Sequence, residues 1–280
     1  MPEGPEIRTS SDQLKLTLVN KVITGYYKDD KAKTVGFDIN LKCPATIISV
    51  RSYGKKLIFD LDSGHMIITS FKMTGRYQYV AGNHSHVRFD LAEYEIRGSF
   101  KILKPTFSLY YDDVRNMGDV DVIPNNGANI YFRDQGPDLL YHALDEKTWI
   151  SLEVWLSIYN SKNIGRRKII DILLDQSLVC GIGLYLVTDI LYYSGIHPLR
   201  LANTLGQQDW DLIRINAHKV IVLSYSYGGL TIKDFISPDG QRGMYPTVIY
   251  GKTHDPNGFE IVNEKMSGGR TAHYVREIQV

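Results

Sequence analysis

The first seven residues, MPEGPEI, place proline and two carboxylates together at the start of the chain, as Pro2, Glu3 and Glu6. If Met1 is removed, Pro2 becomes an N-terminal secondary amine. Because α-amino groups lose their proton roughly two to three pH units below lysine, such an amine can attack a carbon electrophile while Glu3 handles protons. The same residues also suit a helix start, since proline and carboxylates both favour the first helical turn. These residues alone leave both interpretations open.

The bulk composition is that of a globular protein with room for two domains. The chain has 280 residues, of which 43% are hydrophobic and 22% charged, and its formal net charge is +1. The charge alone does not indicate nucleic-acid binding, and the basic run Ser161–Lys168 also suits a solvated face. Two cysteines, Cys43 and Cys180, argue against a disulfide framework. No membrane span or signal peptide is expected, which favours an intracellular protein of the nucleus, a nucleoid or a viral replication compartment.

The periodicity of the chain predicts an α+β protein. A helix over residues 6–19 precedes short β-rich runs between residues 21 and 111, which are typical of an antiparallel sandwich. The strand pattern ends around "VDVIPNNGANIYFRDQGPDLL", where proline and glycine indicate a linker. Helical patterns follow at residues 147–160, 167–174, 184–194 and 207–226, and "TVIYG" and "TAHYVREIQV" suggest a closing hairpin. The expected parts are a sandwich domain (1–125), a linker (126–146), a helical domain (147–246) and a β-hairpin (247–280).

Gly181 and Gly183 stand just before one of the expected helices, in "VCGIGLYL". Backbone N–H groups at a helix N-terminus form a natural phosphate site. The pattern lacks the third glycine and the preceding strand of a dinucleotide-binding motif, so that interpretation is discarded.

Six stretches taken in order are far more specific than any one of them. They are MPEGPEI, YGKKLIFDL, FKMTGRY, YDDVRNMG, LLDQSLVCGIGLYLVTDILYYSGIHP and GGLTIKDFISPDGQRG. With them the chain resembles the Fpg/Nei family of DNA glycosylases (formamidopyrimidine-DNA glycosylase and endonuclease VIII) over nearly its full length. The resemblance implies a helix–two-turns–helix in the helical domain, a lesion-capping loop around residues 227–243, and a C-terminal hairpin finger.

The resemblance assigns the catalytic roles. Pro2 would attack C1′ of a flipped-out nucleotide, Glu3 would be the general acid and base, and Glu6 would support the site. Lys55 would contact a phosphate or assist proton transfer. Lys56 is adjacent, and since neighbouring strand residues point to opposite faces, only one lysine enters the site. The family motif, a lysine directly after glycine, selects Lys55.

The resemblance also implies the residues that bind DNA. A flipped base leaves a hole in the stack, which apolar wedges and arginine can fill. The matching positions are Met73, Arg115 and Met117, with Asn116 in place of a second arginine and Met117 in place of a common aromatic residue. We expect looser discrimination of the opposite base.

Leu184 stands where the family motif has an asparagine that contacts phosphate. Leucine donates no hydrogen bond, so one backbone contact would be lost and the amides of Gly181 and Gly183 would remain. The alternative is that Leu184 belongs to the core between helices and the phosphate is held elsewhere.

The C-terminal hairpin resembles the family's zinc finger without its ligands. The four cysteine positions correspond to Asn257, Glu260, Val275 and Ile278, and the last two cannot bind zinc. We expect a zincless finger held by apolar packing, with no metal and no cofactor, and with Arg270 on a DNA phosphate. A metal held by His254, Asp255 and His273 is the alternative.

The sequence therefore predicts a bifunctional DNA glycosylase and abasic-site lyase that acts as a monomer on duplex DNA with oxidised bases or abasic sites. The capping loop favours formamidopyrimidines and 8-oxoguanine, whereas MPEGPEI is closer to the branch that prefers oxidised pyrimidines. Leu184 and Asn116 motivate a second hypothesis, a protein that binds lesions or abasic sites with impaired turnover. A helical DNA-binding module would leave the N-terminus unexplained.

Overall fold

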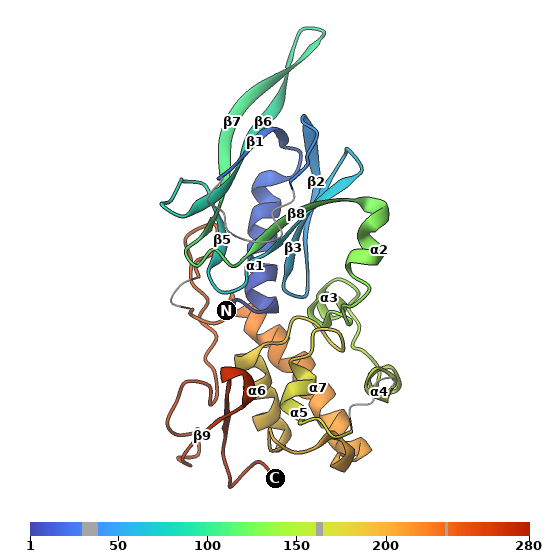
Figure 1. The fold of residues 1–280 in the computed structure, drawn as a ribbon, viewed down its shortest axis with the longest axis vertical. Coiled ribbons are helices and arrows are strands. Elements are labelled where there is room, and N and C mark those ends of the chain that lie inside the picture. Colours follow the sequence, from blue (N-terminus) through green and yellow to red (C-terminus); the bar gives the residue numbers. More distant parts are fainter. Residues whose placement is uncertain (30–38, 161–164, 233–234) are drawn as a thin grey trace. The chain divides into compact units, whose positions relative to one another are not determined.

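The computed structural model describes residues 1–29, 39–160, 165–232 and 235–280, and these form two compact units (Figure 1). The N-terminal unit comprises residues 1–2, 6–133 and 231–243. The helical unit comprises residues 3–5, 134–230 and 244–280. Of the basic run at residues 161–168, residues 161–164 lie outside the described part of the chain.

An antiparallel sheet of eight strands dominates the N-terminal unit, in the order β5-β7-β6-β1-β2-β3-β4-β8. The strands are β1 (Val22–Lys28), β2 (Ala45–Tyr53), β3 (Lys56–Leu61), β4 (His65–Ser70), β5 (Gly75–Gln78), β6 (Ser85–Arg97), β7 (Phe100–Asp113) and β8 (Asp119–Pro124). The strands fold into two facing layers. This is shown by aromatic rings on β3 and β5, which are in contact although these strands are far apart in the strand order. The centroids of Phe59 and Tyr77 are 5.3 Å apart. The predicted α+β sandwich is confirmed.

The main core of this unit lies between the layers and helix α1 (Gly4–Leu18). Ile7, Leu14 and Leu18 recur at helical spacing and are buried in that core. Alternation in β3 directs Leu57 and Phe59 inward, while Ile58 lies in a smaller cluster with Tyr131 and Phe132. The expected linker contains short helices, since α2 (Ala128–Tyr131) and α3 (Leu139–Leu144) both form there.

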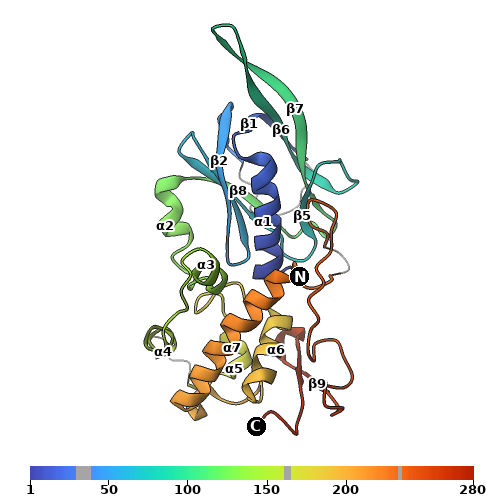
Figure 2. The same ribbon diagram turned by 180° about the vertical axis from the view of Figure 1, so that it is seen from behind.

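Helices build most of the helical unit. They are α3, α4 (Leu152–Asn160), α5 (Ile169–Leu173), α6 (Leu184–Ser194) and α7 (Gln207–Ser226), and α6 lies beside α7 (Figure 2). Helix α6 is apolar nearly all round and is buried, as such a pattern predicts. It ends at Gly195, whose φ of +68° is the left-handed conformation that glycine adopts without strain. No helix in the described ranges is long and apolar enough to cross a membrane.

The C-terminal hairpin consists of β9 (Val262–Lys265) and β10 (Thr271–Tyr274). The prediction of a strand at residues 247–251 is wrong. The backbone N–H groups of Val248 and Ile249 donate instead to the buried carboxylate of Asp189 on α6, at 3.0 and 3.3 Å. The Asp189 side chain thus accepts the backbone N–H groups that would otherwise pair with a neighbouring strand.

Candidate functional site

Glu3 caps the N-terminus of α6. Its Oε2 accepts hydrogen bonds from the backbone N–H groups of Gly183 at 2.7 Å and Leu186 at 3.4 Å, and its Oε1 accepts one from Tyr185 at 3.1 Å. The side chain of Glu3 is only 3% exposed. Because free N–H groups and the helix dipole both favour negative charge at this end, the helix stabilises the ionised carboxylate.

The two glycines before α6 shape the pocket for Glu3. A Cβ on Gly183 would lie 2.2 Å from Cδ of Glu3, so only glycine fits there. Gly181 accepts a hydrogen bond from the N–H of Gly4 at 2.8 Å and donates its own N–H to Gln176 Oε1 at 3.0 Å. Both amides that were predicted to bind phosphate therefore have acceptors within the protein. Their contact with DNA stays a prediction.

Leu184 is the first residue of α6 and is half-buried. It packs against the core of the helical unit. This placement supports the structural alternative for Leu184 over a vacant phosphate contact.

The other predicted catalytic residues lie in the N-terminal unit. Pro2 is buried, and Glu6 is completely buried in the first turn of α1. Tyr53 pairs with Lys56 across the β2–β3 hairpin, so Lys55 lies in its tight turn directly after Gly54, whose φ is +56°.

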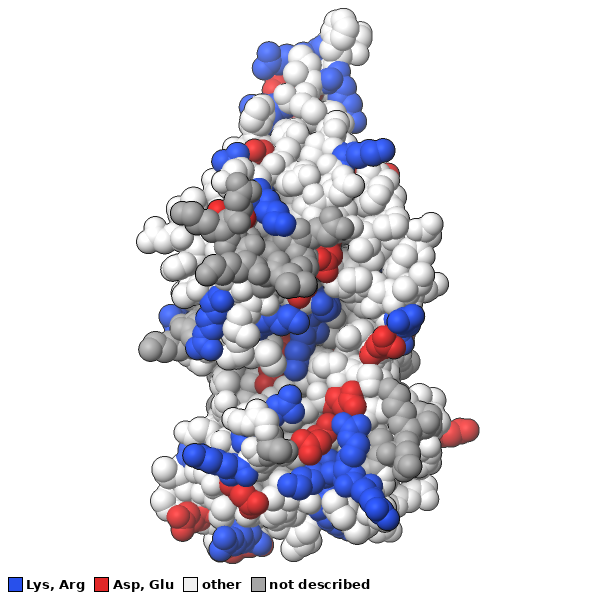
Figure 3. Space-filling view, viewed as in Figure 1, with Lys and Arg blue, Asp and Glu red and all other residues white. Residues whose placement is uncertain are grey.

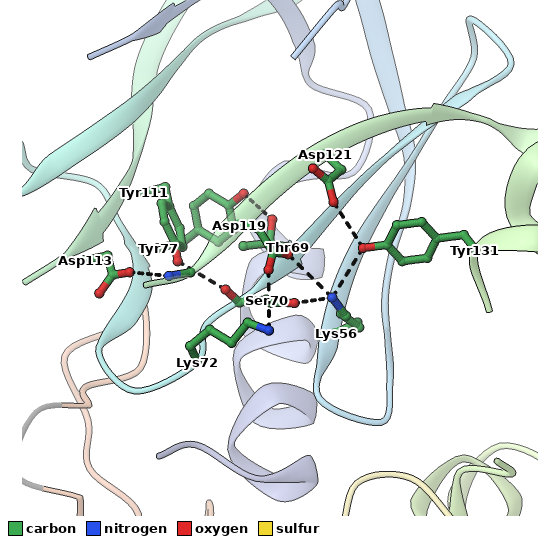
Figure 4. Close-up of polar contacts among 11 residues, drawn as sticks. Lys56, Thr69, Ser70, Lys72, Tyr77, Tyr111, Asp113, Asp119, Asp121 and Tyr131 are labelled. Atoms are coloured by element: carbon green, nitrogen blue, oxygen red, sulfur yellow. Dashed lines mark hydrogen bonds and ion pairs between the residues drawn. The ribbon is translucent and has the colours of Figure 1, made fainter. Parts of the chain in front are cut away.

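Lys56 faces a polar cluster inside the unit (Figure 4). Its Nζ donates to the hydroxyl of Ser70 and lies 3.3 Å from the hydroxyl of Tyr131. Burial lowers the pKa of Lys56, and the carboxylate of Asp119 opposes this effect. The role of Lys55 as the functional lysine stays a prediction.

The predicted void-filling residues occupy two turns that Asp113 joins. The carboxylate of Asp113 is fully buried and accepts the N–H groups of Met117 at 2.8 Å and Gly118 at 2.7 Å. It also accepts the hydroxyl of Thr74, which in turn accepts the N–H of Arg115 at 3.0 Å.

Met73 directly precedes Thr74 in the turn between β4 and β5 (residues 71–74), the Met73 turn. Because Thr74 donates to Asp113, this carboxylate holds the Met73 turn against the Arg115–Met117 loop. Met73 is half-buried, Arg115 and Met117 are exposed, and Asn116 adopts a φ of +50°. The structure thus places the three predicted void-filling residues and Asn116 in one unit. Sequence reasoning missed Asp113, although a buried acid inside a quoted motif was a usable signal.

Residues 231–232 and 235–243 of the predicted capping loop belong to the N-terminal unit, whereas residues 227–230 belong to the helical unit. Phe235 is buried in the main core of the N-terminal unit, with its ring centroid 6.1 Å from that of Phe71. Asp239 accepts a hydrogen bond from the Gln13 side chain at 2.8 Å. The loop is therefore anchored at both Phe235 and Asp239.

An apolar cluster occupies the predicted finger. Val275 is completely buried with Ile249 and Ile261, and Ile278 packs against them. Two of the four positions that correspond to zinc ligands, Val275 and Ile278, thus hold apolar side chains that cannot bind the metal.

The carboxylate of Asp255 has partners within the finger. Burial raises the pKa of Asp255, but hydrogen bonds lower it by more, so the pKa lies below its usual value. The donors are the Tyr192 hydroxyl and the backbone N–H groups of Phe259 and Asn257. In the described part of the chain, His, Cys, Asp and Glu side chains form no group of three that would suit a metal. The alternative ligand set of His254, Asp255 and His273 gains no support.

Arg270 is exposed at the turn of the hairpin. It lines a cavity of about 480 Å³ together with Arg167, Asp171 and Asp175. Arg167 is paired with Asp175 at 2.9 Å. The predicted phosphate contact of Arg270 stays a prediction.

Two family models match the chain, one in each unit for most of its length. Residues 1–120 match the N-terminal domain model of formamidopyrimidine-DNA glycosylase, and residues 151–235 match its H2TH domain model. The formamidopyrimidine-DNA glycosylase of Oceanobacillus iheyensis is 30% identical over 298 residues, which cover 98% of this chain and 95% of the relative. The chain belongs to the Fpg/Nei family of DNA glycosylases. A DNA glycosylase function in DNA repair follows from this membership.

Further family members agree over the full length. The formamidopyrimidine-DNA glycosylase of an Exiguobacterium species is 29% identical, covering 100% of this chain and 99% of the relative. The crystal structure of the Fpg protein of Thermus thermophilus has a TM-score of 0.83 at 21% identity and covers 99% of this chain and 98% of that one. The fold of this Fpg/Nei protein is therefore that of a solved family member.

Proposed function

We propose that the protein is a bifunctional glycosylase and abasic-site lyase that removes oxidised bases through a Schiff base on Pro2. The observation that carries the proposal is Glu3, a buried carboxylate next to Pro2 in sequence. Three backbone N–H groups at the N-terminus of α6 hold it, those of the preceding Gly183 and of Tyr185 and Leu186. A carboxylate needs such fixed donors to remain in place through a proton-transfer step.

The reaction begins at the Pro2 amine after removal of Met1. The neutral amine attacks C1′ of the flipped-out nucleotide, and the bond from C1′ to the damaged base breaks, so the base leaves with the electron pair and takes a proton from solvent. The ionised Glu3 accepts the proton that the Pro2 nitrogen loses and delivers it to the sugar oxygen, so the ring opens and an iminium forms between Pro2 and C1′. The resulting iminium makes the C2′ proton acidic, so elimination of the flanking phosphates follows. Glu6 supports the N-terminus, and Lys55 contacts a phosphate or assists proton transfer.

The proposed substrate is duplex DNA that carries formamidopyrimidines, 8-oxoguanine, oxidised pyrimidines or abasic sites. The Met73 turn and the Arg115–Met117 loop, joined by Asp113, provide one apolar and cationic set of side chains to fill the vacated stack. Methionine suits this task because its thioether is flexible and polarisable. A panel of duplexes that differ only in the damaged base would rank these substrates.

Borohydride trapping on abasic DNA tests the mechanism. The protein with a free Pro2 should form a covalent complex, whereas Pro2→Ala and a protein with an uncleaved N-terminal tag should form almost none. Strand cleavage at the normal rate by the tagged protein would refute the mechanism. Tight binding of abasic DNA by the free protein without any trapped complex would favour the alternative, a lesion-binding protein with impaired turnover.

A further inference from the structure

Lys72 occupies a backbone conformation that a lysine rarely adopts. It lies in the turn between β4 and β5 with a φ of +48°, and its side chain is 48% exposed. Glycine would take this left-handed conformation without strain. Strained residues of this kind concentrate at functional sites, where the side chain is needed.

Two lysines share the carboxylate of Asp119 (Figure 4). Its Oδ1 lies 3.5 Å from Nζ of Lys56, and its Oδ2 lies 3.6 Å from Nζ of Lys72. Lys56 is the more buried of the two lysines. Tyr131, which contacts Lys56, donates in turn to Asp121 at 3.2 Å. Because Lys56 already compensates the charge of Asp119, Lys72 presents its ammonium group to solvent in a fixed direction.

This ammonium group lies beside the predicted void-filling residues. Lys72 directly precedes Met73, and Asp119 directly follows Gly118 at the end of the Arg115–Met117 loop. A side chain that enters the base stack brings its neighbours close to the phosphates of the same strand. DNA carries a charge about every 1.7 Å along its axis, so an exposed cation at this place would have a phosphate within its reach.

We propose that Lys72 binds a backbone phosphate beside the flipped nucleotide, and that Asp119, compensated by Lys56, directs it there. This inference rests on the proposed glycosylase function and adds a binding residue to it. It also provides a phosphate ligand in a chain whose Leu184 cannot donate a hydrogen bond.

Binding to a duplex with a tetrahydrofuran abasic analogue, measured from low to moderate salt, tests the inference. Lys72→Gly removes the charge and the backbone strain together. We expect affinity to fall about ten-fold and the slope of log K against log salt to shrink by about 0.9, with the thermal midpoint not lowered. Lys72→Arg should keep the wild-type slope. Asp119→Asn should keep the wild-type salt slope, because Lys72 keeps its charge. It should reduce the preference for the analogue over undamaged duplex, because Lys72 loses the ion pair that orients its side chain.

Lys101→Gln is the matched control, since Lys101 is another exposed lysine of the same unit and its Nζ lies over the Tyr94 ring. It should leave both the affinity and the slope unchanged. Wild-type affinity and slope in Lys72→Gly would overturn the inference and leave Lys72 with a structural role only. If the wild-type protein shows no preference for the analogue, the proposed glycosylase function fails instead.

Discussion

At the scale of single residues, the most informative contact joins positions that are 180 residues apart, Glu3 and Gly183. Sequence motifs placed both residues in the site, but they assigned the glycine amide to DNA phosphate. The structure assigns that amide to the carboxylate of Glu3. The glycine is therefore required by Glu3 itself, whatever the DNA does.

Gly183→Ala tests this requirement. The new methyl group would displace the Glu3 carboxylate, and each lost hydrogen bond to a charged group costs about 1.5–3 kcal/mol. We expect at least a hundred-fold loss of base excision and a clearly lower thermal midpoint. Gly206→Ala is the control, because a Cβ at Gly206 meets no atom within 4 Å. Normal excision by Gly183→Ala would show that Glu3 does not need its position on α6.

Leu184→Asn separates the two explanations of Leu184. Since Leu184 packs against the helical core, an amide there would be partly buried without a partner and should cost about 1–3 kcal/mol. We expect a lowered thermal midpoint and unchanged affinity for abasic-analogue DNA. Tighter binding with an unchanged midpoint would restore the interpretation of Leu184 as a lost phosphate contact.

At the scale of elements, one buried acid organises the β7–β8 connection. Asp113 accepts hydrogen bonds from both turns that carry the void-filling residues, so its loss should affect DNA discrimination as well as folding.

Asp113→Asn replaces one acceptor oxygen by a donor that faces backbone N–H groups. We expect a loss of about 2–4 kcal/mol of stability and a reduced preference for abasic over undamaged duplex. Its neighbour Asp112 is also buried, but it contacts Arg76 and Ser85 instead. Asp112→Asn should lower stability and keep the preference, and equal effects of the two substitutions would contradict the assigned role.

His218 links α7 to Ile150, two residues before α4, and it makes the stability of the helical unit depend on pH. Its Nε2 accepts the N–H of Ile150 at 3.1 Å, and burial, with Arg214 and His142, lowers its pKa to about 4. An unfolded histidine has a pKa of about 6.5, so the unfolded state binds more protons between these values. Stability from this group is present above pH 6.5 and is lost as the pH falls towards 4, by about 2–4 kcal/mol.

His218→Gln keeps an acceptor for Ile150 without a titrating group. Thermal midpoints at pH 7 and pH 4.5 should therefore differ less in this variant than in the wild-type protein. The same difference in both proteins would show that His218 is not the titrating group.

Local patterns predicted some elements well and others not at all. Helices α6 and α7 begin and end at the predicted residues, because their apolar spacing and the glycines before and after α6 are local signals. Strand β8 was missed because its formation depends on pairing with β4, about fifty residues earlier. The segment at residues 247–251 resembles a strand by composition, yet Asp189 takes its hydrogen bonds. An acid within the apolar α6 was the signal for this contact.

At the scale of the whole molecule, the charges are mixed. Figure 3 shows basic and acidic side chains interspersed on one face, in keeping with the net charge of +1. With so small a net charge, we expect affinity for DNA to depend on a few positioned cations, and the salt dependence of binding would then measure how many of them contact phosphate.

Metal removal provides a whole-molecule test of the finger. Because Val275 and its neighbours hold the finger by apolar packing, a chelator should leave the thermal midpoint and the activity unchanged, and elemental analysis should find no stoichiometric zinc. Val275→Ala should instead lower stability by about 1–3 kcal/mol. One zinc per chain, or unfolding by the chelator, would show that the finger was misassigned.

The division of the chain into units has an evolutionary consequence. Residues 3–5 belong with the helical unit, and residues 231–243 belong with the N-terminal unit. A gene cut at codon 133 would produce one half without Phe235 in its core and another whose helix α6 lacks the Glu3 carboxylate. Neither half is a self-contained cassette. Recombination should therefore exchange the two units only together.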